Sequence, residues 1–157
     1  MLKISNKHST ILSLVIAAIF LVLCIAGCFY VPFLVRLFVN IDRLIRPNAP
    51  MPQSGATVLT VAFYAILFIC LIVSILLLLL LLRVRRNSVF SKLSVSLIRG
   101  ISWCCFLFAF CFAVVGLYFV LAYTIVVATV FLGICIRVVK NVIEQAIEIK
   151  NENDLTV

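Results

Sequence analysis

The sequence predicts an all-α, polytopic membrane protein with four transmembrane helices and both termini in the cytoplasm. Hydrophobic residues make up 66% of the chain and charged residues 11%, a balance that a soluble fold of this size could not hide from water. Three long segments carry no charged residue, and the basic residues lie mostly beside them. At 157 residues the chain forms a single membrane domain, residues 1–157.

The uncharged segments define the spans. Residues 11–35 and 56–82 each exceed the ~20 residues that cross a hydrocarbon core of about 30 Å. Residues 101–136 would measure about 54 Å as one helix, which is too long for one crossing. We therefore expect a turn within residues 117–124, LYFVLAYT, whose tyrosines suit the membrane interface. The predicted spans are residues 11–35, 56–82, 101–119 and 122–143, followed by a cytoplasmic tail at residues 144–157.

The basic residues orient these spans. With four crossings, ten of the 13 Lys and Arg residues share the side of the two termini. The opposite side holds only Arg36, Arg43 and Arg46. Because cytoplasmic connections carry the excess of Lys and Arg, both termini are predicted to be cytoplasmic.

The outer connection after the first span has helical periodicity. One face carries polar residues and proline: Arg36, Asn40, Asp42, Arg43, Arg46 and Pro47. The opposite face is apolar: Leu34, Leu37, Phe38, Ile41, Leu44 and Ile45. This pattern predicts an outer amphipathic segment lying in the headgroup layer. It serves either as a membrane-bound loop or as a recognition surface for a peptide or an anionic lipid.

Cysteines and small residues are interpreted as packing residues. All seven cysteines lie inside the apolar runs, away from the loops where a secreted disulfide framework would place them. No His or carboxylate stands near them, so we expect no metal and no cofactor. Small residues four apart, Ala109 with Ala113 and Thr129 with Gly133, favour close helix packing.

The sequence IAGC, which ends at Cys28, has the form of a bacterial lipoprotein cleavage site, and lipidation there would remove the first span. The apolar run continues through FYVPFLV, however, whereas the core of a signal peptide is only about 7–15 residues long. An uncleaved first helix is therefore the favoured interpretation.

Catalysis is not expected. No soluble stretch is long enough for a catalytic domain, and no acid–base or nucleophile–base pair occurs. Transport is the rival hypothesis: a small exporter of a hydrophobic or cationic compound, with a path lined by Tyr64, Ser74, Trp103 and Tyr123. The uncharged runs offer no carboxylate to recognise a cation, which makes this hypothesis the weaker one.

The C-terminal tail gathers four of the five acidic residues: Glu144, Glu148, Glu152 and Asp154. The fourth span is predicted to continue as an amphipathic helix, with the acids opposite an apolar half made of Val139, Val142, Ile143, Ala146, Ile147 and Ile149. An acidic face is repelled by an anionic inner leaflet, so it suits a protein surface better. That surface is either the basic second connection of the same chain or a basic cytosolic partner.

The last residues form a second candidate contact. Asn153 and Asp154 favour turns over helix interiors, so we expect them to end the helix. Leu155 and Val157 could then extend and add a strand to the sheet edge of a partner, with the terminal carboxylate held by backbone amides. A frayed tail is the alternative.

Two segments resemble a known family. NSVFSKLSVSLIRGISW (residues 87–103) and ENDLTV (residues 152–157) are similar to the characteristic segments of domain of unknown function 2975, a family of small four-helix bacterial membrane proteins found mainly in Firmicutes. Phe90, Ser91 and Arg99 match the first segment, and the second matches from Glu152 to Thr156. Residues 93–97 differ from the charged stretch that the family carries there. The resemblance implies no known activity, but it implies a gene often encoded beside a small helix-turn-helix DNA-binding protein.

Together these observations predict a non-catalytic, multi-pass protein of the bacterial cytoplasmic membrane. Its partners are the lipid bilayer and a cytosolic factor such as a small helix-turn-helix transcriptional regulator, with a homo-oligomer as a further hypothesis. We expect no direct binding of nucleic acid. The candidate partner-binding residues are Glu144, Glu148, Glu152, Asp154, Leu155 and Val157, and the candidate cytoplasmic loop motif is Phe90, Ser91 and Arg99.

Overall fold

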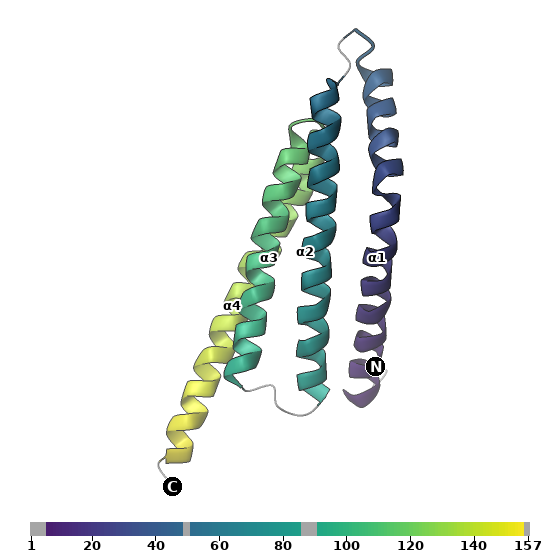
Figure 1. Cartoon of the computed structure of the whole chain (residues 1–157). Helices are drawn as coiled ribbons and strands as arrows, with labels where there is room; N and C mark the ends of the chain where they lie inside the picture. Colours follow the sequence, from purple (N-terminus) through teal and green to yellow (C-terminus); the bar gives the residue numbers. More distant parts are fainter. Residues whose placement is uncertain (1–5, 49–50, 86–90, 156–157) are drawn as a thin grey trace, which may run out of the picture.

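The computed structural model describes residues 6–48, 51–85 and 91–155, with side chains described throughout except at 6–10, 151 and 153–155. These residues form four long helices and no strand, which confirms the all-α fold class (Figure 1). The helices are α1 (Asn6–Ile45), α2 (Gln53–Arg85), α3 (Lys92–Gly116) and α4 (Ala122–Leu155). Each contains a segment long and apolar enough to cross a membrane: Ile11–Ile45, Gln53–Arg85, Lys92–Gly116 and Ala122–Lys150. The chain is a multi-pass membrane protein.

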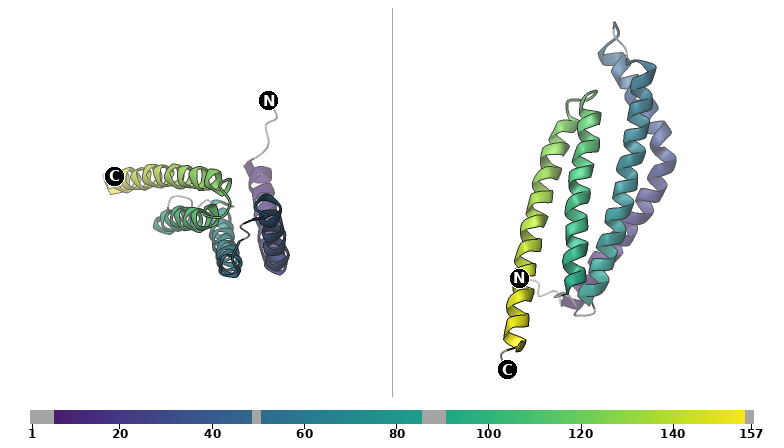
Figure 2. Two further views of the ribbon diagram at one scale, coloured as in Figure 1. Left: turned by 90° about the horizontal axis from the view of Figure 1, so that it is seen from above. Right: turned by 60° about the vertical axis from the view of Figure 1, so that its left-hand side comes forward.

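The helices form an open row. Within the described residues, the backbones of α1 and α2, of α2 and α3, and of α3 and α4 lie close together, and no other pair of helices approaches so closely. Seen from above, the row is an open arc with α1 and α4 at its two ends (Figure 2). The start of α1 and the end of α4 lie at the same end of the molecule, where α4 continues well beyond the start of α3 (Figure 1).

The third uncharged run folds back where the sequence indicates. Helix α3 ends at Gly116 and α4 begins at Ala122, so the turn falls inside LYFVLAYT. A Cβ atom on Gly116 would stand 2.9 Å from atoms of the Tyr123 ring. Glycine at this position therefore allows the ring to pack directly on the end of α3.

The contact between α1 and α2 follows a seven-residue repeat. Along α1, Ala17, Cys24 and Val31 are buried at intervals of seven, and so are Val35 and Asp42. This spacing keeps one stripe of a helix facing its neighbour, as in coiled coils. The stripe runs through Pro32 without interruption, since α1 is one continuous helix.

All four helices are linked near the α3–α4 turn. The Phe38 ring of α1 lies 5.5 Å from the Phe63 ring of α2 and 4.7 Å from the Phe119 ring of the turn, between centroids. Leu59 of α2 is fully buried beside them. The surrounding core consists of Ala62, Ile66, Val115 and Ala122. This end of the arc is therefore the best-packed part of the molecule.

The amphipathic segment predicted to lie in the headgroup layer is the last part of α1, which continues the first candidate span without a break. One of its residues, Asp42, does not lie on the predicted polar face. Asp42 was expected among the polar, headgroup-facing residues, but its side chain is only 4% exposed and turns toward α2. Its Oδ2 atom accepts a hydrogen bond from the Met51 backbone N–H at 2.8 Å. A buried carboxylate needs such a partner, and this one fastens the connection between α1 and α2. The prediction was wrong because the spacing of polar residues along a helix does not show that Asp42 will meet a hydrogen-bond donor, the Met51 amide, nine residues later.

We expect Asp42→Ala to release this connection. The Met51 N–H would lose a charged acceptor, and the loss of such a bond corresponds to at least about a tenfold faster opening. Hydrogen–deuterium exchange at the Met51 amide measures this directly. Asn40→Ala, on the exposed side of the same helix, is the matched control and should leave the exchange rate unchanged. Equal rates in the two variants would exclude this role for Asp42.

Candidate functional site

A groove with charges of both signs lies between the start of α3 and the extension of α4. Its volume is about 550 Å³, and its lining residues are Lys92, Val95, Ser96, Arg99, Glu144, Ile147 and Glu148. The cations stand on α3 and the carboxylates on α4, while Val95 and Ile147 provide apolar surface between them. We call this feature the α3–α4 groove.

Two residues that the sequence singled out separately meet in the groove. The Arg99 guanidinium lies 3.5 Å from Glu144 Oε1, and the Lys140 ammonium lies 2.6 Å from Glu144 Oε2. Glu144 thus accepts from both helices, so at this residue the acidic face contacts basic residues of the same chain, one of the two alternatives that the sequence left open. Glu148 lies one turn further on and is exposed, with no ion pair to any described side chain. The free carboxylate of the groove is therefore that of Glu148.

Comparison with known proteins places the chain in a family. The family described as "Protein of unknown function (DUF2975)" matches residues 4–157. The chain belongs to the DUF2975 family. No curated protein sequence and no solved structure matches it. The membership expected from residues 87–103 and 152–157 is thereby confirmed, and the match covers nearly the whole chain.

Ser91 of the first DUF2975 segment is the N-cap of α3. Its backbone is extended and its Oγ accepts from the Ser94 N–H at 3.3 Å, which satisfies one of the free amides at the helix start. The Arg83 guanidinium at the end of α2 donates to the same Oγ at 3.5 Å. Ser91 therefore fixes where α3 begins and, with it, the position of Arg99 in the groove. Phe90, the neighbouring residue of the segment, lies outside the described residues.

Lys92 and Ser96 line the groove but were not among the candidate residues predicted from the sequence. Lys92, Ser96 and Arg99 follow one another at intervals of four and three along α3, which places them on one helix face. This spacing could have identified the α3 side of the groove.

The tail of the DUF2975 chain is helical for longer than expected. Asn153 and Asp154 were predicted to end the helix, but α4 continues through Leu155. No glycine or proline interrupts this stretch, so nothing forces the backbone out of the helix. Leu155 is the last residue of the helix, and its predicted contact with a partner stays a prediction. Val157 lies outside the described residues, as does the side chain of Asp154.

The apolar half of the tail is only partly covered. Ile143 and Ile147 are half-buried toward α3, whereas Val142 and Ile149 are 58% and 59% exposed. The extension thus presents carboxylates on one side and an uncovered apolar strip on another. Glu152 is exposed near its end.

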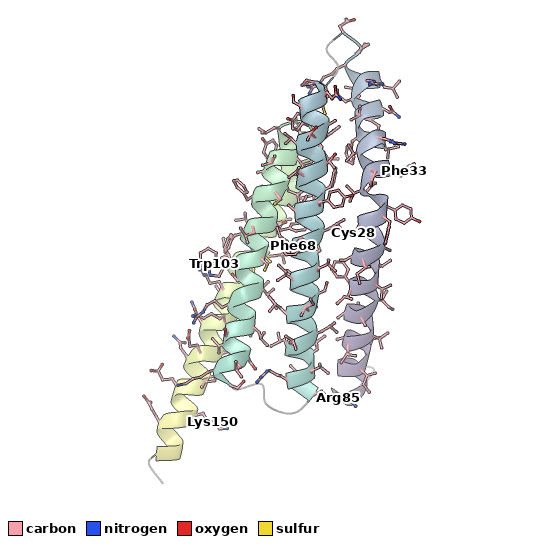
Figure 3. All side chains as sticks on the ribbon, viewed as in Figure 1. Cys28, Phe33, Phe68, Arg85, Trp103 and Lys150 are labelled. Atoms are coloured by element: carbon pink, nitrogen blue, oxygen red, sulfur yellow. The ribbon has the colours of Figure 1, made fainter. Side chains whose placement is uncertain are left out.

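The cysteines lie inside the helices, and the residues of the transport hypothesis are dispersed over α2, α3 and α4. Cys28 lies inside α1, where its thiol donates to the Cys24 carbonyl at 3.5 Å (Figure 3). No group of three or more His, Cys, Asp or Glu side chains is placed to hold a metal in the described part of the chain. Tyr64, Trp103 and Tyr123 are exposed, while Ser74 is buried and donates to the Cys70 carbonyl. None of these four lines the α3–α4 groove.

Proposed function

We propose that this DUF2975 protein is a non-catalytic membrane partner of a basic cytosolic protein, and that the partner docks a helix in the α3–α4 groove. The protein would sit in the bacterial cytoplasmic membrane with both termini inside. The observation that carries the proposal is the α3–α4 groove. Val95 and Ile147 give it apolar surface, and the unpaired Glu148 lies beside them. The helix that carries Glu148 extends past the start of α3 (Figure 1).

The charges favour a basic partner. Glu144 is already neutralised by Arg99 and Lys140, so the carboxylate that most readily attracts a new cation is Glu148. Glu152 lies one turn beyond it on the same helix. An amphipathic helix could place apolar residues on Val95 and Ile147 and a basic residue against the Glu148 carboxylate, which is the usual helix-in-groove arrangement.

A small helix-turn-helix transcriptional regulator fits this description, because DNA-binding proteins carry basic surfaces. The resemblance to the family favours the same class of partner, since a gene for such a regulator often lies beside the gene of a family member. A regulator held on the tail would be kept from its DNA. Release would then connect a change at the membrane to transcription.

Site-specific photocrosslinking tests the docking site. A photoreactive amino acid at Ser96, on the exposed rim of the groove, is expected to capture a DNA-binding protein in living cells. The same residue at Val127, which is 71% exposed on the apolar part of α4, is the matched control. Identical adducts at both positions, or a captured protein that does not bind DNA, would count against the proposal.

Charge variants give the quantitative prediction. Glu148→Lys places a cation where the partner presents its own, so we expect at least about a tenfold loss of affinity for the captured regulator. Lys92→Glu removes a competing cation from the opposite wall and should strengthen binding. Binding of the purified regulator to the protein in nanodiscs measures both effects. Weaker binding by both variants would indicate general damage to the groove, and unchanged binding by both would exclude it as the docking site.

A further inference from the structure

The guanidinium of Arg137 lies against two aromatic rings on an exposed side of the α3–α4 pair. The Arg137 guanidinium carbon of α4 lies 5.2 Å from the centroid of the Trp103 ring and 5.8 Å from that of Phe106, both on α3. The two rings are 6.2 Å apart in an edge-to-face arrangement. Trp103 is 55% exposed and projects from the side of the molecule away from α1 and α2 (Figure 3). The guanidinium is thus held in place yet remains accessible.

Arg137 has no carboxylate partner among the described side chains. The nearest acid along α4 is Glu144, which pairs with Lys140 and Arg99 instead. These four groups together leave an excess of positive charge at this level of the molecule. A cation beside so much apolar surface requires a counter-charge from elsewhere.

Its position along α4 places Arg137 near a membrane surface. It lies about 22 Å along the helix from the turn at Ala122, counted at 1.5 Å per residue. With the turn at one face of a hydrocarbon core of about 30 Å, the guanidinium can reach the opposite face by extending its side chain. Tryptophan is enriched at the same level, where Trp103 stands. The counter-charge available there is a lipid phosphate.

We propose that Arg137, Trp103 and Phe106 form a binding site for the phosphate of an anionic glycerophospholipid in the leaflet on the side of the two termini. A guanidinium binds phosphate oxygens through two parallel hydrogen bonds, and the rings hold it in the required orientation. From Trp103 an exposed apolar strip continues through Leu107 and Phe110 toward the membrane interior. An acyl chain of the bound lipid lies along this strip. The positive charge of Arg137, which no described carboxylate balances, selects a headgroup with net negative charge.

The protein carries its own probe, because Trp103 is its single tryptophan. The full chain is placed in phosphatidylcholine vesicles that contain increasing fractions of acyl-brominated phosphatidylglycerol or of acyl-brominated phosphatidylcholine. We expect the phosphatidylglycerol to quench Trp103 fluorescence at a mole fraction about fivefold lower, the preference expected for one cation near an anionic lipid. Arg137→Gln should remove the preference while quenching by both lipids persists. Arg85→Gln, at the exposed end of α2, is the matched control and should retain it.

Equal quenching by the two lipids in the wild-type protein would overturn the proposal, as would a preference that survives in Arg137→Gln. Helix content measured by circular dichroism shows whether Arg137→Gln has unfolded. If it has, Arg137→Lys takes its place, because lysine keeps the charge but cannot form two parallel hydrogen bonds. This variant should show a reduced preference for phosphatidylglycerol. Millimolar inorganic phosphate that abolishes the preference at constant ionic strength would assign the site to a soluble phosphate and exclude the lipid.

Discussion

Leu59→Ala is expected to lower the free energy of unfolding by about 2–5 kcal/mol, the cost of truncating a fully buried leucine. Leu59 is 0% exposed, and its cluster includes Val115 of α3 and Ala122 of α4. Within a bilayer, helices associate through packing, because the lipid offers the same apolar surroundings as a leucine side chain. A cavity where three helices meet therefore removes contacts that lipid cannot replace.

Unfolding by sodium dodecyl sulfate from dodecyl maltoside micelles measures this loss. Leu79→Ala, at a 47% exposed position of the same helix, removes the same atoms from a face that contacts detergent. It should change stability by less than about 0.5 kcal/mol. Similar losses in the two variants would mean that the cluster around Leu59 does not hold the helices together.

The fold class could be predicted from the sequence because a membrane imposes a length on every uncharged run. Residues 101–136 are too long for one crossing, and the turn appears at Gly116–Ala122 for that reason. The order of packing could not be predicted in the same way. Lipid-facing Val127 and buried Val115 are equally apolar, so hydrophobic periodicity does not distinguish the two faces of a membrane helix.

The candidate site could be predicted in part, because charge is informative where apolar character is not. The acids of the tail and Arg99 were selected independently, and the structure joins them through Glu144. Asp42 shows the limit of the same reasoning. Its burial depends on the Met51 amide across the connection, a tertiary contact that helical spacing does not encode. The α3 side of the groove could have been predicted from the spacing of Lys92, Ser96 and Arg99, which share a helix face.

The contact between α3 and α4 positions both the α3–α4 groove and the proposed lipid site at Arg137. This contact depends on Gly133. A Cβ atom there would lie 3.3 Å from both Cys105 Cβ and the Phe106 ring. The absence of a side chain lets α3 approach, so that the buried Ser102 hydroxyl donates to the Gly133 carbonyl at 3.0 Å. Gly133 was predicted with Thr129 as a small-residue packing pair, and Gly133 is indeed buried in this contact.

We therefore expect Gly133→Leu to force α3 and α4 apart, with a loss of about 3 kcal/mol in the free energy of unfolding. The branched side chain cannot enter the space beside Phe106, and separating the helices also breaks the hydrogen bond from Ser102. Because Phe106 stacks under Arg137, the emission of Trp103 should change together with stability. Unfolding in mixed micelles, followed through that emission, records both effects. Val127→Leu, a lipid-facing substitution on the same helix, should behave as the wild-type protein. If Gly133→Leu unfolds at the wild-type detergent fraction, the close approach of α3 and α4 is not what maintains their contact.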